Sequence, residues 1–72
     1  MKNYKLSDLL SDYDFVNRVL DNPDNKRKHI SAIRTMIHNF EMKYNHLYLK
    51  HREYFIALRL KLDNLRIKFI TT

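Results

Sequence analysis

Cationic side chains are the most abundant groups in this sequence that could take part in binding chemistry. The 72 residues contain 14 Lys and Arg against 8 Asp and Glu, and the formal net charge is +6. Residues 1–25 hold three cations and five aspartates, whereas residues 26–72 hold eleven cations and three acids. A segment with this charge favours a polyanion or an acidic protein as partner. The predicted binding cations are Lys26, Arg27, Lys28, Lys43, Lys50, Arg52, Arg59, Lys61, Arg66 and Lys68.

Aromatic side chains gather in the middle of the same basic segment. Tyrosine and methionine are common in protein interfaces, and this region contains both. We therefore predict a protein-binding surface here, formed either with a second copy or with another protein. The predicted interface residues are Phe40, Tyr44, Tyr48, His51, Tyr54, Phe55, Leu58 and Leu62.

The residue types do not favour catalysis or a bound metal. The sequence has no cysteine and no glycine, so it offers no thiolate ligand and no glycine-rich phosphate loop. No two of its four histidines are four residues apart, and a zinc site needs three or four converging ligands. No hydroxyl has a histidine placed to activate it in a recognisable arrangement. We expect a protein that is not an enzyme and that has no cofactor and no metal.

One apolar stripe runs through the segment that carries these groups. From Lys26 to Thr72 there is neither glycine nor proline, and apolar residues recur every three or four positions, apart from one gap that His51 fills. This spacing places the side chains on one face of a helix. The stripe consists of Ile30, Ile33, Ile37, Phe40, Tyr44, Leu47, Tyr54, Leu58, Leu62, Leu65 and Phe69.

The N-terminal part predicts a shorter, acidic helix over about 7–21. Ser7 is a suitable N-cap, and Asp8 would lie in the first turn, where a negative charge favours the helix dipole. The residue before Pro23 is disfavoured in a helix, so the chain should turn there. With Asn22 as N-cap and Pro23 at the first helical position, a second helix would then run over about 24–70.

Whether this second helix breaks decides the architecture. Asn45-His46 is its weakest helix-forming pair, and a break there would give a three-helix bundle with helices at 7–21, 24–43 and 47–70. The stripe keeps its phase across this pair, which favours a continuous helix. We therefore predict one all-α domain over 1–72, a helical hairpin. Because the long helix outreaches the short one, we also predict a homodimer that covers its far half, with an antiparallel arrangement that resolves the charges better.

These features predict a small non-enzymatic regulator or inhibitor that binds a larger host protein or a nucleoprotein complex. The alternatives are a direct DNA- or RNA-binding accessory protein and a structural self-assembly helix. The richness in Lys, Asn, Ile, Tyr and Phe is typical of AT-rich genomes, which many phages and plasmids have. No run of 18 apolar residues occurs, and residues 1–10 lack the apolar core of a signal peptide. We expect a cytoplasmic protein without membrane association.

Overall fold

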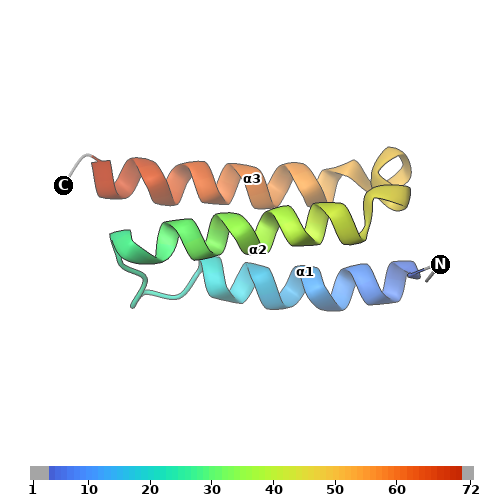
Figure 1. Ribbon diagram of the computed structural model, residues 1–72, viewed down its shortest axis with the longest axis horizontal. Helices are drawn as coiled ribbons and strands as arrows, with labels where there is room; N and C mark the ends of the chain where they lie inside the picture. The colour runs from blue at the N-terminus through green and yellow to red at the C-terminus, as the bar shows by residue number, and fades with distance from the viewer. Residues whose placement is uncertain (1–3, 71–72) are drawn as a thin grey trace.

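The computed structural model describes residues 4–70, and every regular element in that part of the chain is helical. Three α-helices follow one another, namely α1 (Leu6–Leu20), α2 (Ile30–Lys43) and α3 (Tyr48–Ile70). Successive helices run in opposite directions along one long axis (Figure 1). The Cα atoms span 42 × 18 × 16 Å. The all-α prediction is therefore confirmed.

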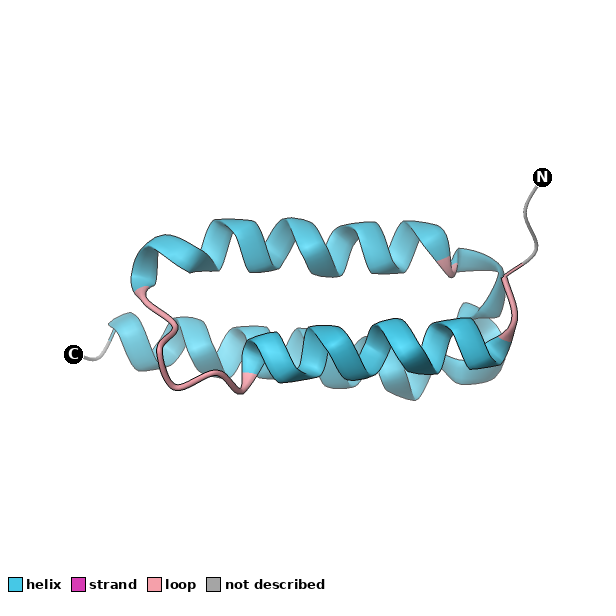
Figure 2. Ribbon diagram, turned by 90° about the horizontal axis from the view of Figure 1, so that it is seen from below, coloured by secondary structure: helices cyan, strands magenta, loops and turns pink. Residues whose placement is uncertain are grey.

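The three helices enclose one core. Each helix contacts both of the others. In the view from below, α1 lies in front of α3, and α2 lies to one side of them (Figure 2). The helix axes thus form a triangle whose interior is filled by side chains from all three helices. The buried residues are Leu9, Val16, Leu20, Ile33, Ile37, Phe40, Tyr44, Phe55, Leu58 and Leu62.

The structure corrects the prediction of one helix over about 24–70. α2 ends at Lys43, and Tyr44 leaves the helical region with φ −110° and ψ 22°. A 3₁₀ turn over Asn45–Leu47 follows, and the Leu47 N–H donates to the Tyr44 carbonyl at 2.9 Å. The break lies beside the weak pair that the alternative prediction named. The unbroken phase of the stripe misled the prediction, because two antiparallel helices that face one core both direct their apolar residues inward.

The connection between α1 and α2 is a turn stabilised by two asparagines. The Asn22 carbonyl accepts the Asn25 N–H at 3.2 Å, and its side-chain oxygen accepts the Asp24 N–H at 3.0 Å. The Asn25 amide donates to the Val19 carbonyl at 2.7 Å, which satisfies one of the free acceptors at the end of α1. Helical structure then resumes only at a 3₁₀ turn over Arg27–His29, later than the predicted start at 24.

The first helix begins close to the predicted position but with a different cap. Its N-cap is Lys5 and not Ser7. The Asp8 carboxylate accepts the backbone N–H of Lys5 at 2.9 Å, which is one half of a capping box. Asp8 therefore acts in the first turn as predicted, but it also fixes where the helix starts.

The long apolar stripe is covered within the single chain. Tyr44, Leu58 and Leu62 are at most 1% exposed, because α3 folds back onto α2 and α1 closes the third side. The homodimer was predicted because part of the stripe was thought to be uncovered, and the fold removes that reason. The oligomeric state itself stays a prediction.

None of the helices within residues 4–70 combines the length and the apolar character that a membrane crossing needs.

Candidate binding surface

Most of the predicted interface residues lie in the core. Five of the eight are at most 4% exposed, and their rings pack on one another, as in the Phe40–Phe55 pair at 5.2 Å between centroids. In this fold they are not part of the surface. The five are Phe40, Tyr44, Phe55, Leu58 and Leu62.

The other three predicted interface residues keep some exposure near the start of α3. His51 and Tyr54 are half-buried, and α3 is kinked at His51, where φ is −134° and ψ is 36°. Tyr48 is 42% exposed, and its ring contacts the Phe55 ring edge-on at 5.2 Å. Tyr48 therefore presents the largest accessible aromatic surface of the predicted set.

A polar contact joins the end of α2 to α1. The buried Tyr44 hydroxyl lies 2.5 Å from the Asp12 carboxylate and 3.0 Å from the Asp8 carbonyl, and Lys43 Nζ lies 2.9 Å from the same carboxylate. Burial, with the hydrogen bond and charge of Asp12, raises the pKa of Tyr44 to about 12. Partial burial works to raise the pKa of Asp12, but the hydrogen bonds from Tyr44 and Lys43 outweigh it and leave that pKa lowered. The raised pKa keeps the Tyr44 hydroxyl protonated at neutral pH, and the lowered pKa keeps the Asp12 carboxyl ionised. The contact therefore has a structural role.

Three of the ten predicted binding cations form ion pairs within the chain. Lys43 pairs with Asp12 and Lys61 with Asp21, at 2.9 and 3.0 Å, so both connect to the acidic N-terminal part. Arg59 pairs with both oxygens of Glu41, at 2.8 and 2.5 Å. Part of the charge asymmetry in the sequence therefore reflects helices that pack on one another. Because the side chains of these pairs are partly exposed to solvent, the pairs contribute little to the stability of the fold.

The other predicted cations are exposed and divide between the two ends of the molecule. Lys50 and Arg52 lie near the kink of α3, at the end opposite the α1–α2 turn. The sequence prediction therefore does not describe one continuous patch. The remaining five lie beside the α1–α2 turn or in the last turns of α3, and they are Lys26, Arg27, Lys28, Arg66 and Lys68.

Two adjoining hollows between α2 and α3 collect arginine side chains. The first has a volume of about 310 Å³ and the second about 280 Å³, and they share Ser31 and Arg34. Neither hollow is lined by a carboxylate of the described chain. We call the two together the arginine groove. Its lining residues are Arg27, Ile30, Ser31, Arg34, Thr35, His38, Arg59 and Arg66.

The cations of the arginine groove differ in how they are compensated. Arg59 is already held by Glu41, and this hydrogen bond raises its pKa further. Within residues 4–70, no ion pair or side-chain hydrogen bond involves Arg27, Arg34 or Arg66. Three guanidinium groups thus line one hollow without a counterion from the chain.

The sequence analysis did not select Arg34 as a binding residue. A signal was present, because Arg27 and Arg34 are seven residues apart, as are Arg59 and Arg66. A seven-residue interval places Arg59 and Arg66 on one side of α3, whereas Arg27 lies in the 3₁₀ turn that precedes α2. That the two pairs line one groove depends on the fold-back of α3, which the sequence prediction lacked.

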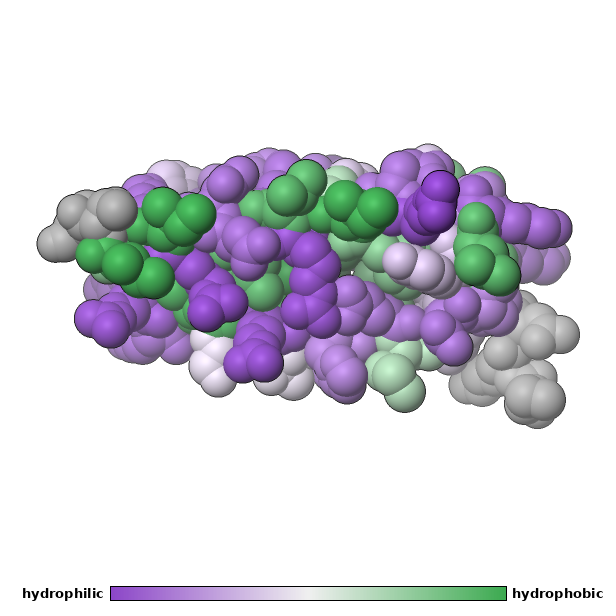
Figure 3. All heavy atoms as spheres, turned by 90° about the horizontal axis from the view of Figure 1, so that it is seen from above, coloured by the Kyte–Doolittle hydropathy of each residue, from purple (hydrophilic) through white to green (hydrophobic). Residues whose placement is uncertain are grey.

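α3 carries apolar side chains on two opposite faces. Its inner face packs into the core through residues such as Leu58. On its outer side the chain exposes four aliphatic residues separated by four, seven and three positions, a spacing that keeps them on one face. We call this set the outer stripe, and Figure 3 shows hydrophobic side chains in an interrupted row along this face. Its members are Ile56, Leu60, Ile67 and Ile70, which are 49–74% exposed.

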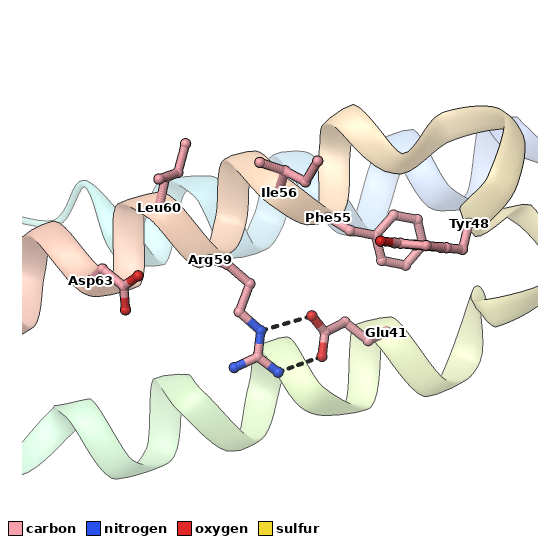
Figure 4. Close-up of a pocket in the computed structure, with 7 residues that line it drawn as sticks. All are labelled: Glu41, Tyr48, Phe55, Ile56, Arg59, Leu60 and Asp63. Carbon is pink, nitrogen blue, oxygen red and sulfur yellow. Dashed lines mark hydrogen bonds and ion pairs between the residues drawn. The ribbon is translucent and has the colours of Figure 1, made fainter.

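The outer stripe and the arginine groove meet at Arg59. Arg59 reaches from α3 to Glu41 on α2, while Ile56 and Leu60 point away from α2 (Figure 4). A hollow of about 190 Å³ at this point is lined by these four residues together with Tyr48, Phe55 and Asp63. The molecule therefore presents an apolar ridge and a cationic groove side by side.

Comparisons of the chain with protein-family models, with curated proteins and with solved structures find no match. Within the described residues, no group of three His, Cys, Asp or Glu side chains is arranged to hold a metal ion.

Proposed function

We propose that this protein is a small non-enzymatic regulator or inhibitor that binds a larger protein through the outer stripe of α3. The observation that carries the proposal is the exposure of four large aliphatic side chains on the face opposite the core. Covering the exposed part of each would contribute about 1 kcal/mol. Exposed apolar side chains that gather on one face, here interrupted by Glu53 and Asp63, are typical of interaction sites.

The charges beside the outer stripe favour an acidic amphipathic helix as the occupant. Arg52 and Arg66 lie along one edge of the stripe, and Arg59 between them is already paired with Glu41. A partner helix would place its apolar face on the stripe and its acidic residues beside these arginines. Such charge complementarity guides association and fixes the orientation of the partner.

A second copy of this chain fits the outer stripe less well. Two α3 helices packed antiparallel through it would place Arg52, Arg59 and Arg66 beside the same residues of the other copy. A parallel pair would place them near Lys50 and Ala57, which offer no negative charge. Like charges across an interface oppose association. A role in self-assembly alone is therefore less well supported than binding to a different protein.

An anionic membrane is also a poor occupant for this face. Glu53 and Asp63 interrupt the row of aliphatic residues at positions on the same side of α3. Acidic residues within the apolar face oppose insertion among anionic headgroups. The proposed setting is the cytoplasm, and the proposed target is a host protein or a nucleoprotein complex, of the kind that phage-encoded regulators bind.

The proposal is tested by affinity capture from the native host with matched surface variants. Leu60→Glu and Ile67→Glu place a negative charge in the outer stripe, and both should abolish capture of the target because apolar contact is lost. Met42→Glu is the control, because Met42 is a 68% exposed apolar residue on α2. The captured proteins are quantified by mass spectrometry.

A second step identifies the binding segment. Acidic amphipathic peptides from the captured protein should bind the wild-type chain in titration calorimetry and should not bind Leu60→Glu. A protein retained by both stripe variants, or one lost equally with Met42→Glu, would contradict the proposal.

A further inference from the structure

We propose that the arginine groove binds the phosphate backbone of single-stranded nucleic acid, with Arg27, Arg34 and Arg66 contacting the phosphates. This inference concerns the arginine groove, which adjoins the outer stripe and shares Arg59 and Arg66 with its edge, and it does not depend on the protein partner proposed above. It rests on the charge of the groove, on its continuity and on the aromatic side chain near its end.

The positive charge of the first hollow favours the binding of an anion. Arg27, Arg34 and Arg66 line it without a carboxylate, and no described residue forms an ion pair with them. A guanidinium group presents a fork of donors that matches a phosphate, so arginine clusters suit this ligand. The Ser31 hydroxyl in the same hollow can donate as well.

The continuity of the groove favours a polymer of phosphates over a single ion. Arg34 and Ser31 line both hollows, so an anion in the first lies beside an anion in the second. His38 and Arg59 continue the lining towards the kinked end of α3. A backbone with regularly spaced phosphates can follow this succession, whereas an isolated phosphate uses only one part of it.

The aromatic side chain near the end of the groove favours unpaired bases. Arg59 lines both the second hollow and the neighbouring one, which contains Tyr48 together with Glu41 and Asp63. Figure 4 shows this neighbouring hollow, in which Glu41 is paired with Arg59. The Tyr48 ring is 42% exposed and is supported edge-on by Phe55. Single-strand-binding proteins combine a cationic groove with such stacking surfaces. Bases in a duplex are already stacked and cannot use the Tyr48 ring.

The binding experiment uses fluorescence anisotropy with labelled deoxythymidine and uridine oligonucleotides. Three phosphate contacts predict that log K falls with log salt at a slope of about −2 for a single strand. Binding of either oligonucleotide with this slope supports the proposal, and comparison of the two distinguishes DNA from RNA. Absence of binding to both in dilute buffer would overturn it.

Variants locate the site. Arg34→Ala should weaken binding at least about tenfold and reduce the slope by about 0.7, because Arg34 lines both hollows. The matched control is Arg18→Ala, which removes the same charge from α1, where Arg18 pairs with the exposed Asp14. Arg18→Ala should change binding less than about twofold. Equal losses for the two variants would show diffuse attraction and overturn the proposal.

Two further measurements separate nucleic acid from other polyanions. Tyr48→Leu removes the stacking ring but keeps an apolar side chain, and it should weaken oligonucleotide binding about fivefold or more. If inorganic polyphosphate binds as tightly as the oligonucleotides and Tyr48→Leu has no effect, the assignment to nucleic acid is overturned. Binding to phosphatidylglycerol vesicles but not to oligonucleotides would also overturn it. Because no protein partner is present, failure here leaves the proposal for the outer stripe unaffected.

Discussion

Tyr44 shows how one side chain can be both core and connector. Its ring is fully buried between α1 and α2, and its hydroxyl reaches the Asp12 carboxylate at 2.5 Å. The same residue leaves the helical region and ends α2. Tyr44 therefore fixes α1 against the point where the chain turns back, which gives its hydroxyl a measurable part in stability.

We expect Tyr44→Phe to lower the free energy of unfolding by about 1 kcal/mol, the net contribution of one hydrogen bond. The ring and its packing remain, and Lys43 still neutralises Asp12. Urea denaturation at neutral pH measures the change. Tyr48→Phe is the control, because the Tyr48 hydroxyl makes no hydrogen bond to described residues. Equal effects of the two substitutions would show that the Tyr44 hydroxyl contributes nothing specific.

The raised pKa of Tyr44 predicts a loss of stability in alkali. Its folded-state pKa of about 12 exceeds the ordinary value of 10.0 because of burial and the hydrogen bond and charge of Asp12. The stabilisation is therefore complete below pH 10 and is lost as the pH rises from 10 towards 12. The difference corresponds to about 2–3 kcal/mol. In urea denaturation at several pH values, the wild type should lose stability across this window more steeply than Tyr44→Phe, and parallel curves would contradict the prediction.

At the scale of the helices, α3 differs from its neighbours in having two apolar faces. Its inner face is covered by α1 and α2, whereas the outer stripe is exposed. The two faces alternate along the sequence, so Leu58 and Leu60 are close in the chain but opposite in environment. This contrast gives a direct test of the orientation of α3.

We expect Leu58→Ala to cost about 2–5 kcal/mol, because it leaves a cavity in the core. Leu60→Ala should change stability by less than about 1 kcal/mol, since Leu60 is 57% exposed. Chemical denaturation of both variants under the same conditions measures the difference. A larger cost for Leu60 than for Leu58 would show that the outer face of α3 is packed in solution.

The bounds of the helices can be compared with those expected from the sequence. α1 spans Leu6–Leu20, close to the helix expected over about 7–21, although its N-cap is Lys5 and not Ser7. The sequence analysis preferred a continuous helix to a break near Tyr44, because apolar periodicity shows only which side of a helix is covered. It does not record whether consecutive turns belong to one helix or to two that face each other.

At the scale of the whole molecule, the acidic N-terminal part and the basic remainder are packed against each other. Asp12 and Asp21 each pair with a cation of α2 or α3. The remaining positive charge lies outside these contacts, and three arginines gather in the first hollow of the arginine groove. The charge asymmetry of the sequence thus has one part that forms ion pairs between the helices and another part that we propose binds a partner.

We expect the isolated protein to be a monomer, in contrast to the homodimer predicted from the sequence. The apolar stripe that was thought to need a second subunit is covered within the chain, and the arginines beside the outer stripe oppose self-association. Light scattering should give a mass near 8.9 kDa at micromolar concentration. A stable dimer that Leu60→Glu dissociates would show instead that the outer stripe binds a second copy.

The sequence by itself determined that this chain is helical, that its core residues follow a helical period and that its positive charge lies after residue 25. These properties depend on residue type and local spacing, which a sequence displays directly. Only the tertiary structure decided which apolar residues are buried and which cations share a groove. The reason is that α3 folds back at Tyr44, so one stripe closes into a core, a second stripe is left outside, and arginines from separate helices come to lie beside one another.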